Sequence, residues 1–157
     1  MLSIDIICVG KLKEKFFLDA VNEYKKRLGA YCKLNILELA EIPVKNDAEI
    51  ERSLSSEGEV ILSKIPKDAY VVAMCVEGEG ISSEKLAEKM NALTVSGKSK
   101  FCFLIGGSNG LSDRVKERSD FRLSMSRMTF PHHLARVMVL EQIYRAFKIQ
   151  EGSGYHK

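Results

Sequence analysis

Hydrophobic residues follow two patterns along this chain: short apolar runs, and apolar positions at helical spacing. The short runs predict strands, because apolar stretches of this length bounded by turn residues are typical of buried β-structure. The helical spacing predicts helices, as where Phe17, Val21, Tyr24 and Leu28 share one face. The expected strands cover residues 2–9, 34–39, 70–76, 100–105 and 121–125. The expected helices cover residues 16–28, 48–64, 84–93, a short stretch ending at 118, and 131 to about 150.

Turn and capping residues set the expected ends of these elements. Gly29 stops the first helix, and Ser82 or Ser83 caps the third. Residues 77–80 are expected to close the third strand, and Pro131 suits the first position of the last helix. Strands that alternate with helices indicate an α/β fold with a mainly parallel, centrally buried sheet flanked by helices.

Composition narrows the class of protein without identifying it. A chain of 157 residues, 45% hydrophobic and 29% charged, is long enough to form one domain over residues 1–157 with a sizeable core. The net charge of +3 permits a nucleic-acid partner but does not argue strongly for one. No apolar run approaches the length of a membrane span, and the N-terminus lacks the pattern of a signal peptide. We therefore expect a cytoplasmic protein that does not associate with a membrane. Cys8, Cys75 and Cys102 lie in apolar runs and are expected to be buried.

Three of the expected strands end in segments with unusual chemistry, and ligands of parallel sheets bind beyond the carboxyl ends of the strands. These segments are residues 74–80, 106–110 and 125–133. In the last of them, apolar and hydrogen-bonding residues alternate, which suits an amphipathic small molecule. A core strand with a loop packed against it explains the same pattern equally well.

The glycine-rich segment, residues 106–110, matches no nucleotide fingerprint. Its three glycines do not fit G-x-G-x-x-G, and no Gly-Lys-Ser/Thr follows. A phosphate cradle is therefore weakly supported, and Asn109-Gly110 is more typical of a tight turn. Adjacent His132 and His133 point in different directions from a helix and have no third ligand at a suitable spacing, so no metal site is predicted.

The last helix carries more apolar surface than a terminal helix on one sheet face usually needs. Leu140, Tyr144 and Phe147 form a stripe along it. Core packing is the first explanation of this stripe, and a dimer interface is the second. Glu141 and Arg145 lie four residues apart and can pair along the helix.

The C-terminal tail, residues 152–157, combines glycines with side chains that can act in binding or catalysis. Its two glycines favour a frayed terminus, which is the default interpretation. It nevertheless ends with Tyr155, His156 and Lys157, which bring an aromatic face, an imidazole and an ammonium group.

Several segments together carry a resemblance to a known family. They are Ile105-Gly106-Gly107-Ser108-Asn109-Gly110-Leu111, residues 125–132, Glu141-Gln142-Ile143-Tyr144-Arg145-Ala146 and Tyr155-His156-Lys157. Val9-Gly10-Lys11-Leu12-Lys13 and Ser82-Ser83-Glu84 also fit, so the resemblance extends over essentially the whole chain. In these segments the chain resembles the ribosomal RNA large subunit methyltransferase H family of the SPOUT class. The resemblance implies a SPOUT-type fold with a deep C-terminal trefoil knot, which is an exception among proteins.

The resemblance also implies an activity and partners. It implies an enzyme that uses S-adenosyl-L-methionine to methylate N3 of a pseudouridine in helix 69 of 23S rRNA. The implied substrate is the assembled ribosome, and the implied state is a homodimer. The family's cofactor-binding positions correspond here to Met74, Gly106, Met125, Ser126, Arg127, Met128, Thr129 and Phe130.

Two positions depart from the family pattern. Met74-Cys75 stands where the family usually has leucine and then an acidic residue, and Glu79 stands where lysine is common. Methionine keeps an apolar wall for the adenine. Cys75, in contrast, removes a carboxylate from the expected cofactor site.

The implied substrate suggests roles for the C-terminal residues. N3 of pseudouridine is mostly protonated at neutral pH and must lose its proton before it attacks the methyl group, so a base or a nearby cation helps. By residue type, His156 is the candidate base and Tyr155 stacks on the nucleobase. Arg145 or Lys157 then meets a phosphate or the developing anion.

Two other functions fit parts of the sequence. An RNA-binding module without catalysis shares the basic residues, although the charged face of the first helix is also typical of a solvated surface. A nucleotide-binding α/β protein shares the glycine-rich segment, but the missing Walker lysine counts against it.

Overall fold

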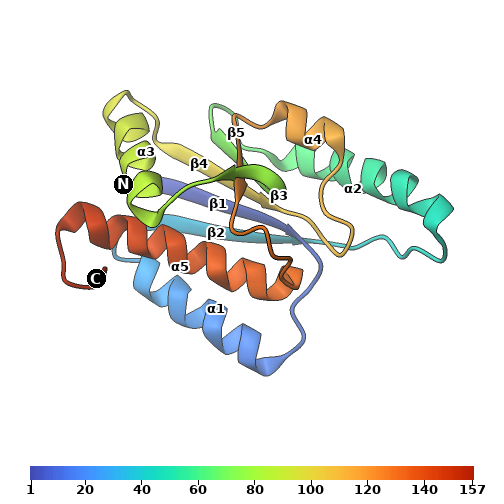
Figure 1. Cartoon of the computed structure of the whole chain (residues 1–157), viewed down its shortest axis with the longest axis horizontal. Coiled ribbons are helices and arrows are strands. Elements are labelled where there is room, and N and C mark those ends of the chain that lie inside the picture. The colour runs from blue at the N-terminus through green and yellow to red at the C-terminus, as the bar shows by residue number, and fades with distance from the viewer.

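Five parallel strands form the centre of the structure, a computed structural model that describes residues 1–157 (Figure 1). They are β1 (Leu2–Val9), β2 (Cys32–Leu39), β3 (Tyr70–Gly80), β4 (Lys100–Ile105) and β5 (Phe121–Ser124). Their order across the sheet is β2-β1-β4-β3-β5, and every neighbouring pair is parallel. The predicted α/β class with a parallel sheet is therefore confirmed.

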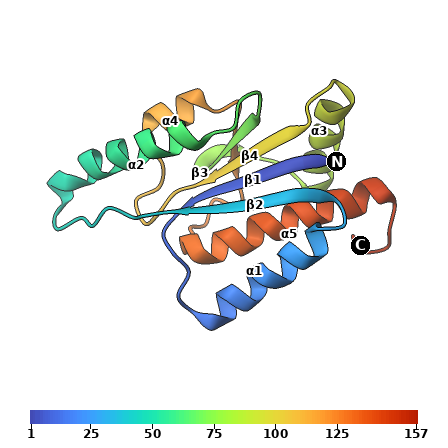
Figure 2. The same cartoon turned by 180° about the vertical axis from the view of Figure 1, so that it is seen from behind.

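Helices cover both faces of this sheet (Figures 1 and 2). One face carries α1 (Lys15–Leu28), α3 (Ser83–Val95) and α5 (His132–Glu151), and the other carries α2 (Ile50–Lys64) and α4 (Asp113–Arg118). A short 3-10 helix, η1 (Asp47–Glu49), leads into α2. The inner strands β1 and β4 are buried along most of their length, because both of their faces are covered. No helix combines the length and the hydropathy needed to span a bilayer.

The apolar stripe of α5 is covered within the single chain. Leu140 and Phe147 are buried in the larger core. Tyr144 is half-buried and makes edge-on aromatic contacts with Tyr24 of α1 and with Tyr31, which lies just before β2. Core packing, the first of the two explanations, therefore accounts for Leu140 and Phe147 within the single chain.

The end of β3 differs from the prediction. Residues 77–80 do not close the strand but continue it past a bulge, because Met74 and Glu79 both pair with Leu123 of β5. Gly78 sits inside the bulge, and a Cβ there would come within 2.8 Å of the carbonyl carbon of Arg122. The residues between the two pairings thus leave the ladder, which re-aims their side chains.

Two boundaries close to the carboxyl end of β5 differ from the prediction by one residue. β5 ends at Ser124 rather than at Met125, because a local turn takes over: the Ser124 hydroxyl donates to the Ser126 carbonyl at 3.0 Å. Pro131 caps α5 instead of occupying its first helical position, and its carbonyl accepts from the Ala135 N–H at 2.9 Å.

A buried arginine ties α5 to the carboxyl ends of β1 and β2. Arg136 is 1% exposed and donates to the Glu38 carboxylate at 2.6 Å and to the Gly10 carbonyl at 2.9 Å. Glu38 also accepts the Leu12 N–H at 3.0 Å. Partial burial raises the pKa of Glu38, but the Leu12 N–H and the guanidinium outweigh it and hold that pKa below its ordinary value. These bonds fix the start of α5, and with it one wall of the cavity described below.

Candidate functional site

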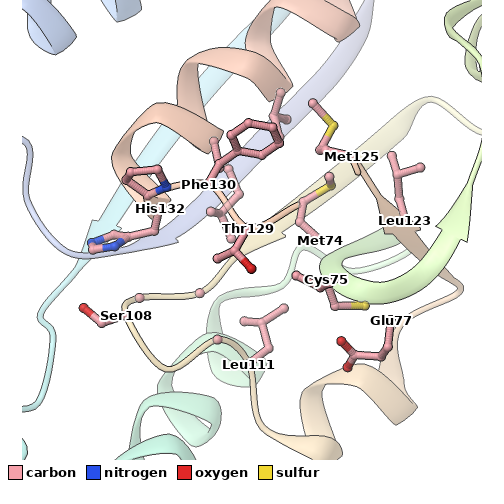
Figure 3. A pocket seen from close by; sticks show the side chains of 18 of the residues that line it. Met74, Cys75, Glu77, Ser108, Leu111, Leu123, Met125, Thr129, Phe130 and His132 are labelled. Atoms are coloured by element: carbon pink, nitrogen blue, oxygen red, sulfur yellow. The ribbon is translucent and has the colours of Figure 1, made fainter. Parts of the chain in front are cut away.

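A cavity of about 740 Å³ opens where the carboxyl ends of β4 and β5 meet the bulge of β3 (Figure 3). Its volume lies in the range of small-molecule sites. The wall is built from residues 74–77, residues 105–111, Lys116 of α4, Leu123, Met125, Ser126, residues 128–132, and Ala135 and Val139 of α5. The three strand ends that the sequence singled out therefore converge on one site.

The glycine turn, residues 106–110, forms the floor of this cavity. A Cβ on Gly106 would lie 2.3 Å from the Gly110 carbonyl oxygen, so the chain folds back on itself more tightly than a side chain allows. Gly107 and Gly110 form a bridge, and Gly110 has a φ of 79°, which favours glycine. The tight-turn interpretation is confirmed, and the surface that the turn presents to the cavity is largely backbone.

Glu41, from the loop after β2, holds the glycine turn from outside. Its carboxylate accepts the Ser108 N–H at 3.1 Å and the Ser108 hydroxyl at 3.0 Å. The Ser108 N–H is the main reason that the pKa of Glu41 lies below its ordinary value. Nothing in the local pattern predicts this contact, because the two residues lie 67 positions apart.

The 125–130 loop supplies the opposite wall. Met125, Ser126, Met128, Thr129 and Phe130 line the cavity, with Met128 at its mouth and 74% exposed. In Figure 3 the Phe130 ring and the Met125 and Met74 side chains gather on one side, so this side of the cavity is largely apolar.

Seven of the eight positions predicted to bind the cofactor thus line the cavity. They are Met74, Gly106, Met125, Ser126, Met128, Thr129 and Phe130. The exception is Arg127, whose exposed side chain is not part of the wall.

Charged groups are few in this cavity. Glu77 is the only carboxylate in the wall and pairs with Lys116 of α4. Burial, followed by the neighbouring His133, lowers the pKa of His132, whose Nε2 is buried without a partner. This lowered pKa favours the neutral form of His132 at pH 7. Cys75 also lines the cavity and is only half-buried, so its predicted full burial is wrong, whereas Cys8 and Cys102 are buried as expected.

The predicted catalytic residues lie together, but outside this cavity. Tyr155 donates its hydroxyl to Glu141 at 2.8 Å, and Arg145 donates to the same carboxylate at 2.8 Å, as its predicted helical pair. Arg145 also contacts His156 Nδ1 at 3.0 Å. The last cavity residue of α5, Val139, lies six positions before Arg145, a rise of about 9 Å along the helix.

The contacts of His156 define its tautomer. An arginine only donates, so Nδ1 of His156 accepts from Arg145, and Nε2 carries the hydrogen that it donates to Glu84 of α3. In this position the Nδ1 lone pair, which would accept a proton, already accepts the hydrogen bond from Arg145. The tail is therefore docked on its own chain rather than frayed, and His156 must leave Arg145 before it can accept a proton.

No group of three or more His, Cys, Asp or Glu side chains is arranged to hold a metal ion. The cavity presents an apolar wall, backbone groups of the glycine turn and the Glu77–Lys116 pair.

Comparisons with known proteins identify relatives of this chain. Residues 2–156 match a family model described as "Predicted SPOUT methyltransferase". Proteins named ribosomal RNA large subunit methyltransferase H from Clostridioides difficile (strain 630) and Bacillus pumilus (strain SAFR-032) are each 50% identical over 159 aligned residues. Each alignment covers 99% of this chain and 100% of the relative.

One solved structure extends the comparison to the fold. It is described as a probable methylase family protein from Haemophilus influenzae Rd KW20, and it matches with a TM-score of 0.55. The match covers 98% of this chain and 70% of that chain at 16% sequence identity, so it concerns the fold alone.

Proposed function

The chain belongs to the ribosomal RNA large subunit methyltransferase H family of SPOUT methyltransferases, and from this premise we propose that it methylates large-subunit ribosomal RNA with S-adenosylmethionine. The observation that carries the proposal is the cavity at the carboxyl edge of the sheet. Its wall combines the glycine turn, the 125–130 loop and the bulge of β3, as expected from the family's cofactor-binding positions.

The residues of the cavity fit this cofactor. When bound, S-adenosylmethionine supplies a methyl group on a positively charged sulfur atom. The apolar side chains of Met74, Leu123 and Phe130 suit the faces of an adenine ring, and the backbone of the glycine turn suits its polar edge. The neutral form of His132, which its lowered pKa favours, adds no positive charge beside a sulfonium.

The finer proposal concerns the substrate and the catalytic groups. We assign N3 of a pseudouridine in helix 69 of 23S rRNA, within the assembled ribosome, as the atom that is methylated. His156 then accepts the N3 proton, Tyr155 stacks on the base, and Arg145 or Lys157 stabilises the anion that remains. The family's deep trefoil knot and a cytoplasmic location belong to the same proposal.

The docked tail supports a site that is shared between two subunits. In one chain, Tyr155, His156 and Arg145 engage one another and Glu141 outside the cavity. A homodimer offers these groups a second cavity, that of the partner. Exposed apolar side chains beside the cavity, Met128 and Leu134, are consistent with such a partner.

The proposal is tested with purified protein, labelled S-adenosylmethionine and ribosomes that lack the modification. We expect label in 23S rRNA, at one pseudouridine by mass spectrometry, with assembled ribosomes and not with free 23S rRNA. Thermal stabilisation by S-adenosylmethionine but not by ATP or NAD is the second expected result. Binding of RNA with no response to the cofactor would favour the non-catalytic RNA-binding module instead.

Replacing Gly106 with alanine is expected to weaken S-adenosylmethionine binding by roughly tenfold or more, which corresponds to about 1.4 kcal/mol. The new Cβ meets the backbone of Gly110, so the turn itself must move and the cavity floor with it. Calorimetric titration measures the affinity, and circular dichroism checks the fold. Gly80→Ala is the matched control, since a Cβ there has no atom within 4 Å. An unchanged affinity in Gly106→Ala would remove the turn from the cofactor site.

A further inference from the structure

Glu77 occupies an unusual position in the cavity. It is the only carboxylate among the residues of the wall, and it comes from the segment of β3 that leaves the ladder between Met74 and Glu79. Bulges of this kind re-aim side chains next to binding sites. Figure 3 shows the Glu77 carboxylate beside Cys75, across the cavity from the Phe130 ring. The acidic group that the resemblance predicted at position 75 is absent, but a carboxylate enters the same cavity two residues later.

The surroundings of Glu77 hold it ionised while leaving it accessible. Its Oε1 contacts the ammonium of Lys116, and this hydrogen bond is the main reason that its pKa lies below the ordinary value. The Lys116 side chain is 17% exposed, whereas that of Glu77 is 56% exposed. Lys116 is therefore largely covered, and the carboxylate keeps a solvent-facing surface with acceptor capacity to spare.

The charges of Glu77 and Lys116 indicate which polar group of the ligand Glu77 binds. An adenosyl ligand with an amino-acid end offers three polar groups here: the ribose hydroxyls, an ammonium and a carboxylate. Because Glu77 is already paired with Lys116, it attracts a further cation less strongly than a free carboxylate does, and a ligand carboxylate at its exposed face would meet a like charge. Two neighbouring hydroxyls are neutral donors, and a carboxylate is an acceptor that is known to bind the ribose of nucleotides in α/β folds.

We infer that Glu77 accepts hydrogen bonds from the ribose hydroxyls of the adenosyl cofactor, an inference that rests on the proposed function. This contact makes the cavity selective for ribonucleosides. Lys116 holds the carboxylate in place from α4. The adenine ring then lies toward the apolar wall around Met74 and Phe130.

The test compares ligands that differ in one group. Calorimetry or competition with labelled S-adenosylmethionine is carried out with S-adenosylhomocysteine, which has the amino-acid end, and with 5′-methylthioadenosine, which lacks it. Adenosine and 2′,3′-dideoxyadenosine then differ in the ribose hydroxyls alone. We expect Glu77→Ala to weaken both thioether ligands by the same factor, roughly tenfold or more. The preference of the parent protein for adenosine over dideoxyadenosine should disappear in this variant.

Two controls keep the result specific. Glu79→Ala removes a carboxylate from the same strand outside the cavity wall and is expected to leave all affinities unchanged. Glu77→Gln keeps the shape and one acceptor oxygen and is expected to give an intermediate loss. Because Glu77→Ala leaves the largely covered Lys116 ammonium without its partner, circular dichroism checks that this variant is folded, and Glu77→Gln provides a milder change at the same position.

The other outcomes overturn the inference. If Glu77→Ala weakens S-adenosylhomocysteine but not methylthioadenosine, the carboxylate binds the ammonium instead. If it weakens adenosine and dideoxyadenosine equally, its role is structural, and if it changes nothing, it has no contact with the ligand. Each of these results leaves the proposed function standing. Only a parent protein that binds none of the adenosyl compounds rejects the function together with the inference.

Discussion

Removal of residues 155–157 is expected to lower single-turnover methyl transfer to ribosomes by at least about 100-fold, in line with the loss of a proton acceptor. S-adenosylmethionine binding is expected to survive, because none of these residues lines the cavity. The single change His156→Ala should account for most of the loss and should lower the rate of transfer more than it weakens ribosome binding. Gly154→Ala is the control, since a Cβ there meets no atom within 4 Å and all three end groups remain.

Mixed dimers show whether the tail acts in the same chain or across the dimer. A protomer without residues 155–157 keeps its cavity, and a Gly106→Ala protomer keeps its tail. If the tail reaches the partner's cavity, one site in each mixed dimer is complete and activity returns on mixing. If the tail acts within its own chain, neither site is complete, and the mixture is no more active than the two variants measured separately.

The contrary result is also well defined. A truncated protein that methylates ribosomes at the parent rate would mean that the contacts of Tyr155 and His156 with α5 and α3 only secure the end of the chain. Light scattering on the same samples reports whether the parent protein and the variants are dimers.

Replacement of Arg136 by methionine is expected to destabilise the fold by about 3 kcal/mol, at the low end of the range for breaking a buried ion pair. The change leaves the Glu38 carboxylate without its cation and the Gly10 carbonyl without its donor, and both groups stay partly covered. Urea unfolding at one fixed protein concentration measures the difference. Arg27→Met is the matched control, because its pair with Glu23 is exposed to solvent and should contribute much less to stability.

The same pair predicts a pH dependence. The pKa of Glu38 is lower in the folded protein than the ordinary value of about 4.3 in the unfolded chain. Its contribution to stability is therefore fully present above about pH 4.3 and is lost as the pH falls through the folded pKa. The Arg136→Met variant should lose this part of the acid sensitivity. If its stability falls with acid as steeply as that of the parent, Glu38 is not the group responsible.

The prediction from sequence succeeded where the physics is local. Apolar runs and helical spacing placed all five strands and the long terminal helix, with boundaries that mostly differ by one or two residues. The largest difference has a non-local cause: the bulge that extends β3 requires Gly78 to pack against β5, and such a contact leaves no signal in the periodicity of β3 itself.

The position of the site also followed from the sequence, whereas its polar groups did not. Parallel strands bring their carboxyl ends to one edge, so three unusual strand ends had to meet, and their motifs were enough to recognise the family. The tertiary structure alone decided that Glu41 braces Ser108, that Glu77 enters the cavity beside Lys116, and that His156 docks on Arg145. The reason is physical: whether a position is buried depends largely on the hydrophobicity of its own residue, and the sequence shows this directly. Polar contacts between distant segments depend instead on the register and packing that place two particular side chains within hydrogen-bond distance.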